Sequence, residues 1–508
     1  MKQITRGRQA ASGGWPYQSL VLMAALALGA LGAGALFAAD AVSPEWEVGQ
    51  ADVSPRDLVV TAPPEAPAEL TIQEAVDIAL RHNVGFRRTL QRLLAARSSW
   101  LTARQLWDLE VFGSVTRTGD GEALDSREAG AALRYGATTG ADLSLRAALR
   151  DLQDEESQAE LQASLRQPLL AGAGPASSAY EQLRRARNSY RAALLSFFVE
   201  RQSLVASVIS SYFGALEQQQ LVENQEFSLT LAQEAVRDSE LRLQEGLIAE
   251  LDLTRAQLSL SRAQSALIGQ RRAMRDAMDR LLLLLGLQVD GDPALVTTVS
   301  YEPLEMDLEA AISQALLLQP DLQLADLGLE NREAALRIAR SYSLPSLDLV
   351  GAWRRSDNAL AQDSWTAGLQ LSVPIASRSL REAVLQAQWD LLVEQQAKED
   401  LRQRIVSEVR SQFRAAEAAR ANVEIASQSL EVARSSLHFA RRMVEEGLRT
   451  NRDLLDAQED LTRTSNLLVS SNIAYYLALV RLRQAIGLDI SQDLPTERRE
   501  PQEVPPTP

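Results

Sequence analysis

Cysteine is absent from this sequence of 508 residues, and histidine occurs only twice. The lack of cysteine excludes disulfides, thiolate metal sites, thiol nucleophiles and an acyl-cysteine anchor. The two histidines, His82 and His438, have no metal-ligand spacing around them, and the segment Gly172 to Pro175 lacks the lysine of a phosphate-binding loop. We therefore expect no catalytic residue, no metal and no cofactor, and we do not expect an enzyme.

Aromatic residues make up only 5% of the chain, which argues against a protein built mainly on a large globular β core. Positive charge is in deficit, because the formal net charge is −15. Nucleic-acid binding needs a basic surface, so the charge argues against a nucleic-acid partner. Long apolar runs are missing after the N-terminal segment, so any further membrane crossing has to use β-strands.

Residues 1–41 have the pattern of a signal peptide. A basic start precedes an apolar segment from Leu20 to Phe37, and Ala39-Asp40-Ala41 offers a cleavage site. The alternative is an uncleaved transmembrane anchor, because the apolar segment approaches the roughly 18–20 residues that span a bilayer. Residues 42–69 form a proline-rich leader, and we expect residues 491–508 to be a disordered tail.

The part of the chain after the leader contains an internal duplication. Residues 70–80 reappear as residues 306–316, with apolar or alanine residues at matching positions. Further along, a shift of 201 residues carries the heptad series Val208 to Leu243 onto Val409 to Val444. The expected units are a first repeat over residues 70–290, a linker over residues 291–305 and a second repeat over residues 306–490.

The sequence of each repeat predicts a long helical hairpin. Proline is absent between Pro175 and Pro293, and again between Pro374 and Pro495. We expect hairpins over residues 175–286 and 376–487, with turns at 246–247 and 447–448. An outgoing helix of about 70 residues extends roughly 105 Å, which is too long for one globular domain. The sevenfold spacing of apolar residues indicates coiled-coil packing. Alanines at 419, 426, 433 and 440 permit close approach of helices, which suits helices with neighbours on both sides, as in the wall of a tube.

Between the helices the hydrophobic period changes to two. We expect two strands within about 110–170 and two within about 346–375, each with one apolar face and one small or polar face. Transmembrane barrel strands have this pattern, and the alternative is a solvent-faced sheet in a soluble domain. An added segment at 120–150 either lengthens the strands or forms a surface loop. Four strands cannot close a barrel, so two, three or four copies must join.

The chain resembles the TolC family of outer-membrane efflux proteins over nearly all of residues 70–490. The resemblance implies a fold that is mainly α with transmembrane β. Three protomers build a twelve-stranded outer-membrane β-barrel, with four strands from each chain, and coiled-coil hairpins continue it as a periplasmic α-barrel. The motifs that carry the resemblance are QPLLAGAG (167–174), LPSL (344–347), VPI (373–375), GLIAELD (246–252) and GLRTNRDLLDAQ (447–458).

The same resemblance implies the outer-membrane exit duct of a tripartite efflux or type I secretion system, located in the cell outer membrane and extending into the periplasm. It implies a passive homotrimeric channel in outer-membrane lipid that a periplasmic adaptor (membrane fusion) protein opens at its tip. Through the adaptor, the duct serves an inner-membrane pump of the RND, ABC or MFS type. The alternatives are an adaptor, which carries one hairpin per chain, and a coiled-coil scaffold that transports nothing.

The resemblance also assigns residues at the hairpin tips. Asp453 and Asp456 match acidic rings that constrict the tube, and Arg449 matches a residue that ties neighbouring helices, with Asp252 as its acceptor. Near a helix start, these charges also have a simpler interpretation as solvated residues that the helix dipole favours. The adaptor-docking positions are Gly246, Leu247, Gly447 and Leu448. Independently, glycine is expected at the end of a helix because it adopts positive φ cheaply.

Overall fold

The structure is a computed structural model, which describes residues 64–116, 126–152, 158–246, 248–291, 293–297, 306–356, 363–375, 377–446 and 448–492. All of these belong to a unit that runs from Thr61 to Pro508, and a second unit, Met1–Val60, lies outside them. The expected signal peptide, most of the leader, linker and tail, and the tip residues Leu247 and Gly447 also lie outside the described residues.

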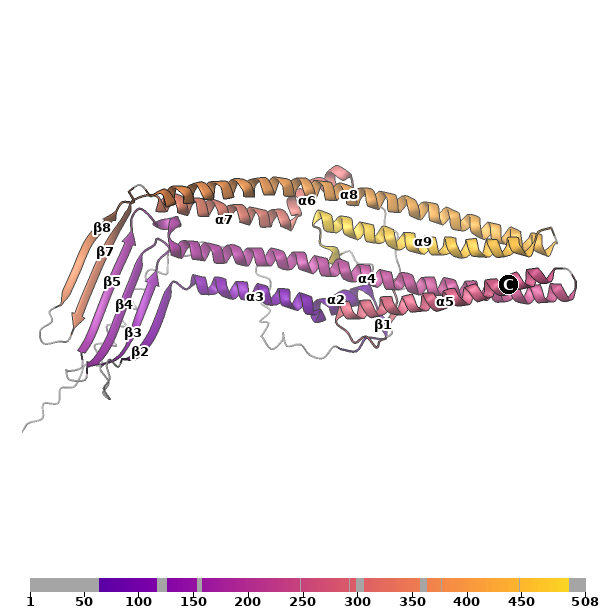
Figure 1. The fold of residues 1–508 in the computed structure, drawn as a ribbon, viewed down its shortest axis with the longest axis horizontal. Helices are drawn as coiled ribbons and strands as arrows, with labels where there is room; N and C mark the ends of the chain where they lie inside the picture. The colour runs from indigo at the N-terminus through magenta and orange to yellow at the C-terminus, as the bar shows by residue number, and fades with distance from the viewer. Residues whose placement is uncertain are drawn as a thin grey trace, which may run out of the picture. The chain divides into compact units, whose positions relative to one another are not determined.

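Two long helical hairpins dominate the described residues (Figure 1). Their outgoing helices, α4 and α8, contain 67 and 68 residues, so the expected long hairpins are confirmed. The first repeat has α2 (Ile72–His82), α3 (Val84–Arg104), η3 (Gly174–Ala176), α4 (Ser178–Gln244) and α5 (Glu250–Leu285). The second has α6 (Leu308–Leu318), α7 (Pro320–Tyr342), α8 (Arg378–Glu445), α9 (Asn451–Ile486) and η4 (Ile490–Gln492).

The helices form a wall that is one layer thick. Next to the β-sheet its order is α3–α4–α7–α8, and towards the hairpin turns it is α5–α4–α9–α8. The long helices α4 and α8 run through both parts, while the shorter helices follow one another along them. The sheet lies at one end of this wall and the hairpin turns lie at the other (Figure 1).

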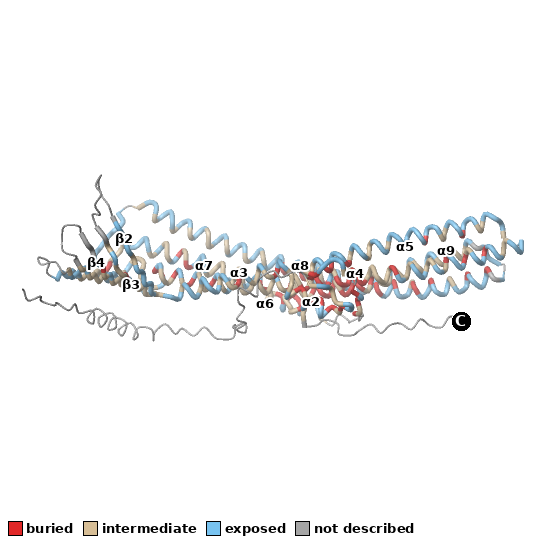
Figure 2. Tube along the Cα trace, turned by 90° about the horizontal axis from the view of Figure 1, so that it is seen from below, coloured by how far each residue is buried: buried red, intermediate tan, exposed pale blue. Residues whose placement is uncertain are grey.

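The hydrophobic core lies midway along the wall, where α2 and α6 pack on the long helices. Figure 2 shows that buried residues gather there, whereas the outer hairpins are mostly exposed. In the sheet, the edge strands are exposed and the inner strands are mostly half-buried. One cluster joins α2, α4, α5 and α9, and it includes Tyr212, Phe213 and Leu281. A second cluster joins α6, the start of α7, α8 and α9. By length and composition, α4 is the one helix among the described residues that could cross a membrane, but its Val205, Ile209 and Leu216 are buried in the first cluster.

The duplication recurs in the hydrogen bonds. The side-chain amide of Asn83 donates to the carbonyl of Leu284 at 2.9 Å, and that of Gln319 donates to the carbonyl of Ala485 at 3.2 Å. The glycines that follow these carbonyls end α5 and α9 in the left-handed conformation, with φ of 75° at Gly286 and 88° at Gly487. A Cβ at Gly286 would lie 2.6 Å from the carbonyl oxygen of His82, so glycine is required there for space as well as for φ.

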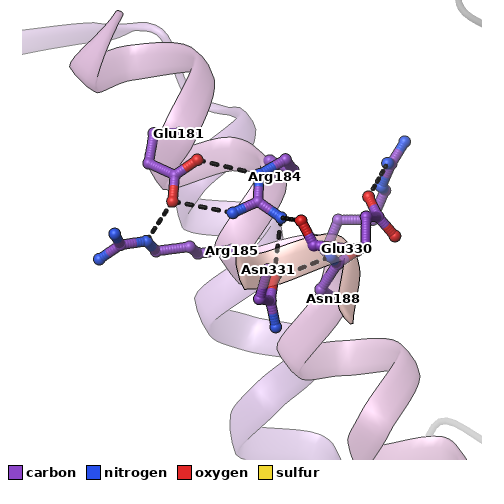
Figure 3. A network of polar contacts seen from close by, with 7 residues as sticks. Glu181, Arg184, Arg185, Asn188, Glu330 and Asn331 are labelled. Atoms are coloured by element: carbon purple, nitrogen blue, oxygen red, sulfur yellow. Dashed lines mark hydrogen bonds and ion pairs between the residues drawn. The ribbon is translucent and has the colours of Figure 1, made fainter. Parts of the chain in front are cut away.

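A buried polar network fixes the start of α4 to α7 (Figure 3). The Arg184 guanidinium donates to both Glu181 oxygens, at 2.8 and 2.9 Å, and to the side-chain oxygen of Asn331 at 2.8 Å. The Asn188 amide donates to the same Asn331 oxygen at 3.1 Å. Burial raises the pKa of Glu181, but hydrogen bonds from Arg184 and Arg185 outweigh it, and the pKa lies below its ordinary value.

Six strands, and not four, form the sheet at the end of the wall. The order is β2–β3–β4–β5–β7–β8, and every neighbouring pair is antiparallel. The strands are β2 (Trp107–Thr116), β3 (Ser126–Gly136), β4 (Asp142–Leu152), β5 (Gln158–Pro168), β7 (Ser346–Ser356) and β8 (Ser364–Ser372). A separate parallel pair joins β1 (Glu69–Leu70) to β6 (Ala294–Leu295).

The expected count of two strands in the first repeat is therefore wrong, because the added segment forms β3 and β4. Small residues explain the error. Ala129 and Ala131 lie on one face of β3, and Gly130 and Ala132 lie on the other, so the strand has little contrast between its faces. The two faces of β3 can be assigned only from its pairing with β2 and β4.

Candidate functional site at the hairpin tips

The first tip is the turn between α4 and α5. Gly246 has a φ of 76° and donates its N–H to the carbonyl of Leu243 at 3.0 Å, so it ends α4 in the conformation expected of a helix-terminal glycine. Asp252 lies in the first turn of α5, where a carboxylate is favoured by the helix dipole. Its partner is Arg255, with Nη1 to Oδ1 at 3.4 Å.

The second tip is the turn between α8 and α9. The N–H of Leu448 donates to the carbonyl of Met443 at 2.8 Å, and the Leu448 side chain is 68% exposed. Thr450 and Asp453 form a capping box at the start of α9. The Asp453 carboxylate accepts from the Thr450 backbone N–H at 3.1 Å and from its hydroxyl at 2.8 Å.

The four predicted gate residues do not all meet within one chain. Arg449 lies 3.7 Å from Asp453, and Arg452 lies 3.7 Å from Asp456, so each of these two acidic residues pairs with an arginine four positions earlier in the sequence. Among the described residues, no ion pair joins Arg449 to Asp252. These pairs are exposed and each contributes little, so they can exchange partners at small cost.

Hydrogen bonds from the Thr450 side chain and backbone hold the pKa of Asp453 below its ordinary value. The carboxylate therefore stays ionised into more acidic solution than an unpartnered aspartate. Because the pKa of Asp453 is lower in the folded state, the cap stabilises α9 at pH values above the ordinary pKa of an aspartate. This stabilisation is lost as the pH falls through the lowered pKa of Asp453. Asp453 is thus part of the helix start, whereas Asp456 has no capping bond among the described contacts.

The sequence pattern of a known family matches most of both repeats. The family is described as "Outer membrane efflux protein", and it matches residues 130–287 and 311–488, which is more than half of the chain. This chain belongs to the outer membrane efflux protein family. Proteins of this family lie in the outer membrane, and so does this chain.

Relatives within the family come from both efflux and secretion systems. The solvent efflux pump outer membrane protein SrpC of Pseudomonas putida is 23% identical over 292 residues, which cover 56% of this chain and 62% of SrpC. The chain thus spans less than two thirds of that relative's length. The alkaline protease secretion protein AprF of Pseudomonas aeruginosa is 25% identical over 351 residues, which cover 65% of this chain and 70% of AprF.

The fold of the family is also found among solved structures. The outer membrane protein VceC of Vibrio cholerae has a TM-score of 0.63 to this chain at 17% identity. The likeness covers 82% of this chain and 96% of VceC. At this identity it shows the fold alone, and it confirms the expected class of long hairpins with a β-sheet at one end.

One contact near the tips of this outer membrane efflux protein was missed from the sequence. The Arg242 guanidinium, near the end of α4, donates to the backbone carbonyl of Val444, near the end of α8, at 3.0 Å. This bond joins the first hairpin to the second. A side chain that reaches a backbone carbonyl on a distant helix leaves no sequence pattern, so only the structure reveals it.

Exposed apolar side chains also gather near the tips. Leu241 and Leu251 flank the first turn, and Phe439 and Leu448 lie near the second; all four are more than half exposed. Of these, only Leu448 was among the expected docking positions. Large apolar side chains grouped at a surface are typical of a contact with another protein.

Proposed function

We propose that this chain is the protomer of a trimeric, passive exit duct in the outer membrane, which serves a tripartite efflux or type I secretion system. The observation that carries the proposal is that the sheet is open at both of its edges. β2 and β8 each have one unpaired edge among the described strands. Open strand edges are unfavourable in lipid, so they require partners.

The helices support the same assembly. Ile425, Val432 and Phe439 are spaced by seven along α8, and each is more than half exposed. Leu251 and Leu258 have the same spacing and exposure on α5, at the opposite side of the wall. Two exposed heptad stripes at the two sides of one layer complement each other between copies, as the a and d positions of coiled coils do. Side-by-side copies bury both stripes and pair both strand edges.

The sheet supports insertion in a bilayer. Its strands contain 9 to 11 residues, the length that crosses a membrane when tilted. Trp107 and Tyr135 are paired near one end of the strands, and Trp353 and Trp365 are paired near the other. Aromatic residues at both ends of an apolar band are typical of membrane–water interfaces.

The hairpin tips are the proposed docking and gating end. A periplasmic adaptor contacts the two turns at Gly246, Leu247, Gly447 and Leu448, and couples them to an inner-membrane pump. In the closed trimer, Asp453 and Asp456 surround the axis, and Arg449 exchanges its own Asp453 for Asp252 of a neighbouring helix. The small free energy of exposed ion pairs makes this exchange compatible with opening.

Cation block in planar bilayers tests the acidic constriction. Asp456→Asn should weaken block by trivalent cations, because removal of one carboxylate per chain lowers the negative potential at the axis. Asp456 is preferred to Asp453 because its replacement leaves the capping box of α9 intact. Asp276→Asn, an exposed acidic residue far along α5 from its start, is the control and should leave block unchanged. Equal block in all three proteins would reject the assignment of Asp456.

A second test concerns the bond between the hairpins. Arg242→Ala should raise the open fraction, since a hydrogen bond from a charged donor contributes about 1.5–3 kcal/mol, or roughly a tenfold change or more in population. Arg271→Ala is the matched control, because Arg271 pairs with Glu226 at 2.7 Å within the first hairpin and has no ion pair to the second among the described residues. An open probability in single-channel recordings that is identical in wild type and Arg242→Ala would count against this bond as part of the gate.

A further inference from the structure

The added strands β3 and β4 continue the sheet and do not leave it. Each is paired along its length on both sides, β3 with β2 and β4, and β4 with β3 and β5. The sheet of the described residues has six strands, and every neighbouring pair is antiparallel, so β2 and β8 run in opposite directions. The β8 edge of one copy can thus pair with the β2 edge of the next in the antiparallel arrangement that the rest of the sheet uses.

The two faces of β3 and β4 match those of the other strands. Leu133 and Tyr135 of β3, and Leu143 and Leu145 of β4, lie on the face that carries Leu109 of β2 and Leu165 of β5. The opposite face carries charged pairs that link neighbouring strands. These pairs are Glu110–Arg134, Glu128–Arg146, Asp348–Arg166 and Glu160–Arg354. Apart from Arg127, Asp151 and Arg355 near the strand ends, one apolar face extends across the six strands. The opposite, charged face carries these ion pairs from β2 to β7 and continues in β8 with uncharged polar or small residues such as Thr366 and Gln370.

The width of the sheet matches the width of the helical wall. Strands spaced about 4.8 Å apart and tilted by about 40° occupy about 6 Å each along a barrel, so six strands cover about 38 Å. Four helices, packed at about 8–10 Å, cover about 32–40 Å. Four strands would cover only about 25 Å. The six-stranded sheet thus continues the four-helix wall α3–α4–α7–α8 without narrowing it.

We infer that three copies close an eighteen-stranded barrel through β8–β2 pairing, with the apolar face towards lipid and the charged face towards the lumen. The inference rests on the proposed trimeric duct and adds the width of its membrane section. Barrel diameter grows roughly in proportion to strand number, so the backbone diameter is about 36 Å, against about 24 Å for twelve strands. The membrane section is as wide as the periplasmic tube, and the tips alone limit the size of the cargo.

Disulfide cross-linking tests the pairing, because the natural chain has no cysteine. Ser114→Cys in β2 is combined in turn with Ser364→Cys, Thr366→Cys or Gln370→Cys in β8, all on the charged face. The full-length protein is oxidised in outer membranes, and the products are sized under denaturing conditions. We expect covalent trimers from at least one pair. Ala148→Cys in β4 replaces Ser114→Cys in a matched series, and we expect only monomers from it.

Other outcomes overturn the inference. Cross-links from Ala148 to β8 would mean that β2 and β3 stand outside a twelve-stranded barrel. Covalent dimers as the largest product would mean that two chains close twelve strands, and a complete absence of covalent oligomers would mean that these edges do not meet. Export is measured separately, as cargo release by cells that carry the uncross-linked protein. Loss of export with intact covalent trimers would refute the proposed function but not the eighteen-stranded barrel.

Discussion

Replacing Ala147 with arginine should prevent most of the protein from accumulating in the outer membrane. Ala147 lies midway along β4 and is paired with Ala131 and Leu161 on the apolar face. An arginine facing lipid at the bilayer midplane costs about 2–4 kcal/mol per chain, and a trimer incurs that cost in every chain. The measurement is the amount of folded trimer in isolated outer membranes.

Two control variants separate charge from bulk. Ala147→Leu adds volume at the same position without charge, and it should accumulate like wild type. Gln370→Arg places the same charge on the opposite face of the sheet, in β8 across from Asp348, and should also be tolerated. If the sheet faced water on both sides, the order would reverse: Ala147→Arg would be harmless and Ala147→Leu would promote aggregation. That reversal would reject membrane insertion of β4.

The helical part of the fold could be predicted from the sequence because its signals are long and repetitive. Heptad positions such as Val208 and Val409 recur across the duplication, and proline is missing from both hairpins. The glycine at the first tip, Gly246, is likewise readable, since a left-handed residue is needed where α4 ends. Heptad spacing, absence of proline and a helix-terminal glycine depend on the local sequence alone, so they can be read without knowing which distant residues are in contact.

The sheet and the gate could be predicted only in part. The faces of β3 become visible only when Leu133 is paired with Leu109 and Leu145, because alanine and glycine carry little hydrophobic contrast. At the tips, the sequence indicated the charged residues but not their partners. Exposed charges pair with whichever neighbour is near, and in one chain Asp453 is near Thr450 and Arg449.

The relatives do not decide between classes of cargo. SrpC is named for solvent efflux and AprF for protease secretion, and both match this chain at similar identity. If the membrane section is as wide as the helical tube, the strands do not select between small molecules and polypeptides. In the proposed assembly, selection then lies at the tips and with the partners that dock there, which agrees with the exposed Leu241 and Leu448 near the two turns.

The largest loss of stability is expected from Arg184→Met. Glu181 and Arg184 are both buried, and the guanidinium also holds Asn331 of α7. Removing one partner of a buried ion pair typically costs about 3–5 kcal/mol, because the other charge remains without compensation. The protein should therefore melt at a lower temperature, as followed by the loss of helical circular dichroism in detergent.

Arg185→Met is the matched control for that variant. Arg185 also pairs with Glu181, but its side chain is 67% exposed, so its loss should cost no more than about 1 kcal/mol.

The pH dependence of stability separates lost charge from lost packing. In wild type, the pKa of Glu181 is lowered, so the ionised carboxylate stabilises the fold at pH values above its ordinary pKa of 4.5. This contribution is lost as the pH falls through the lowered pKa. Without Arg184, burial dominates and the carboxyl prefers to be protonated. The difference between Arg184→Met and wild type should therefore shrink as the pH falls from 7 towards 4, and a difference that stays constant over this range would show that the loss comes from packing rather than from the buried charge.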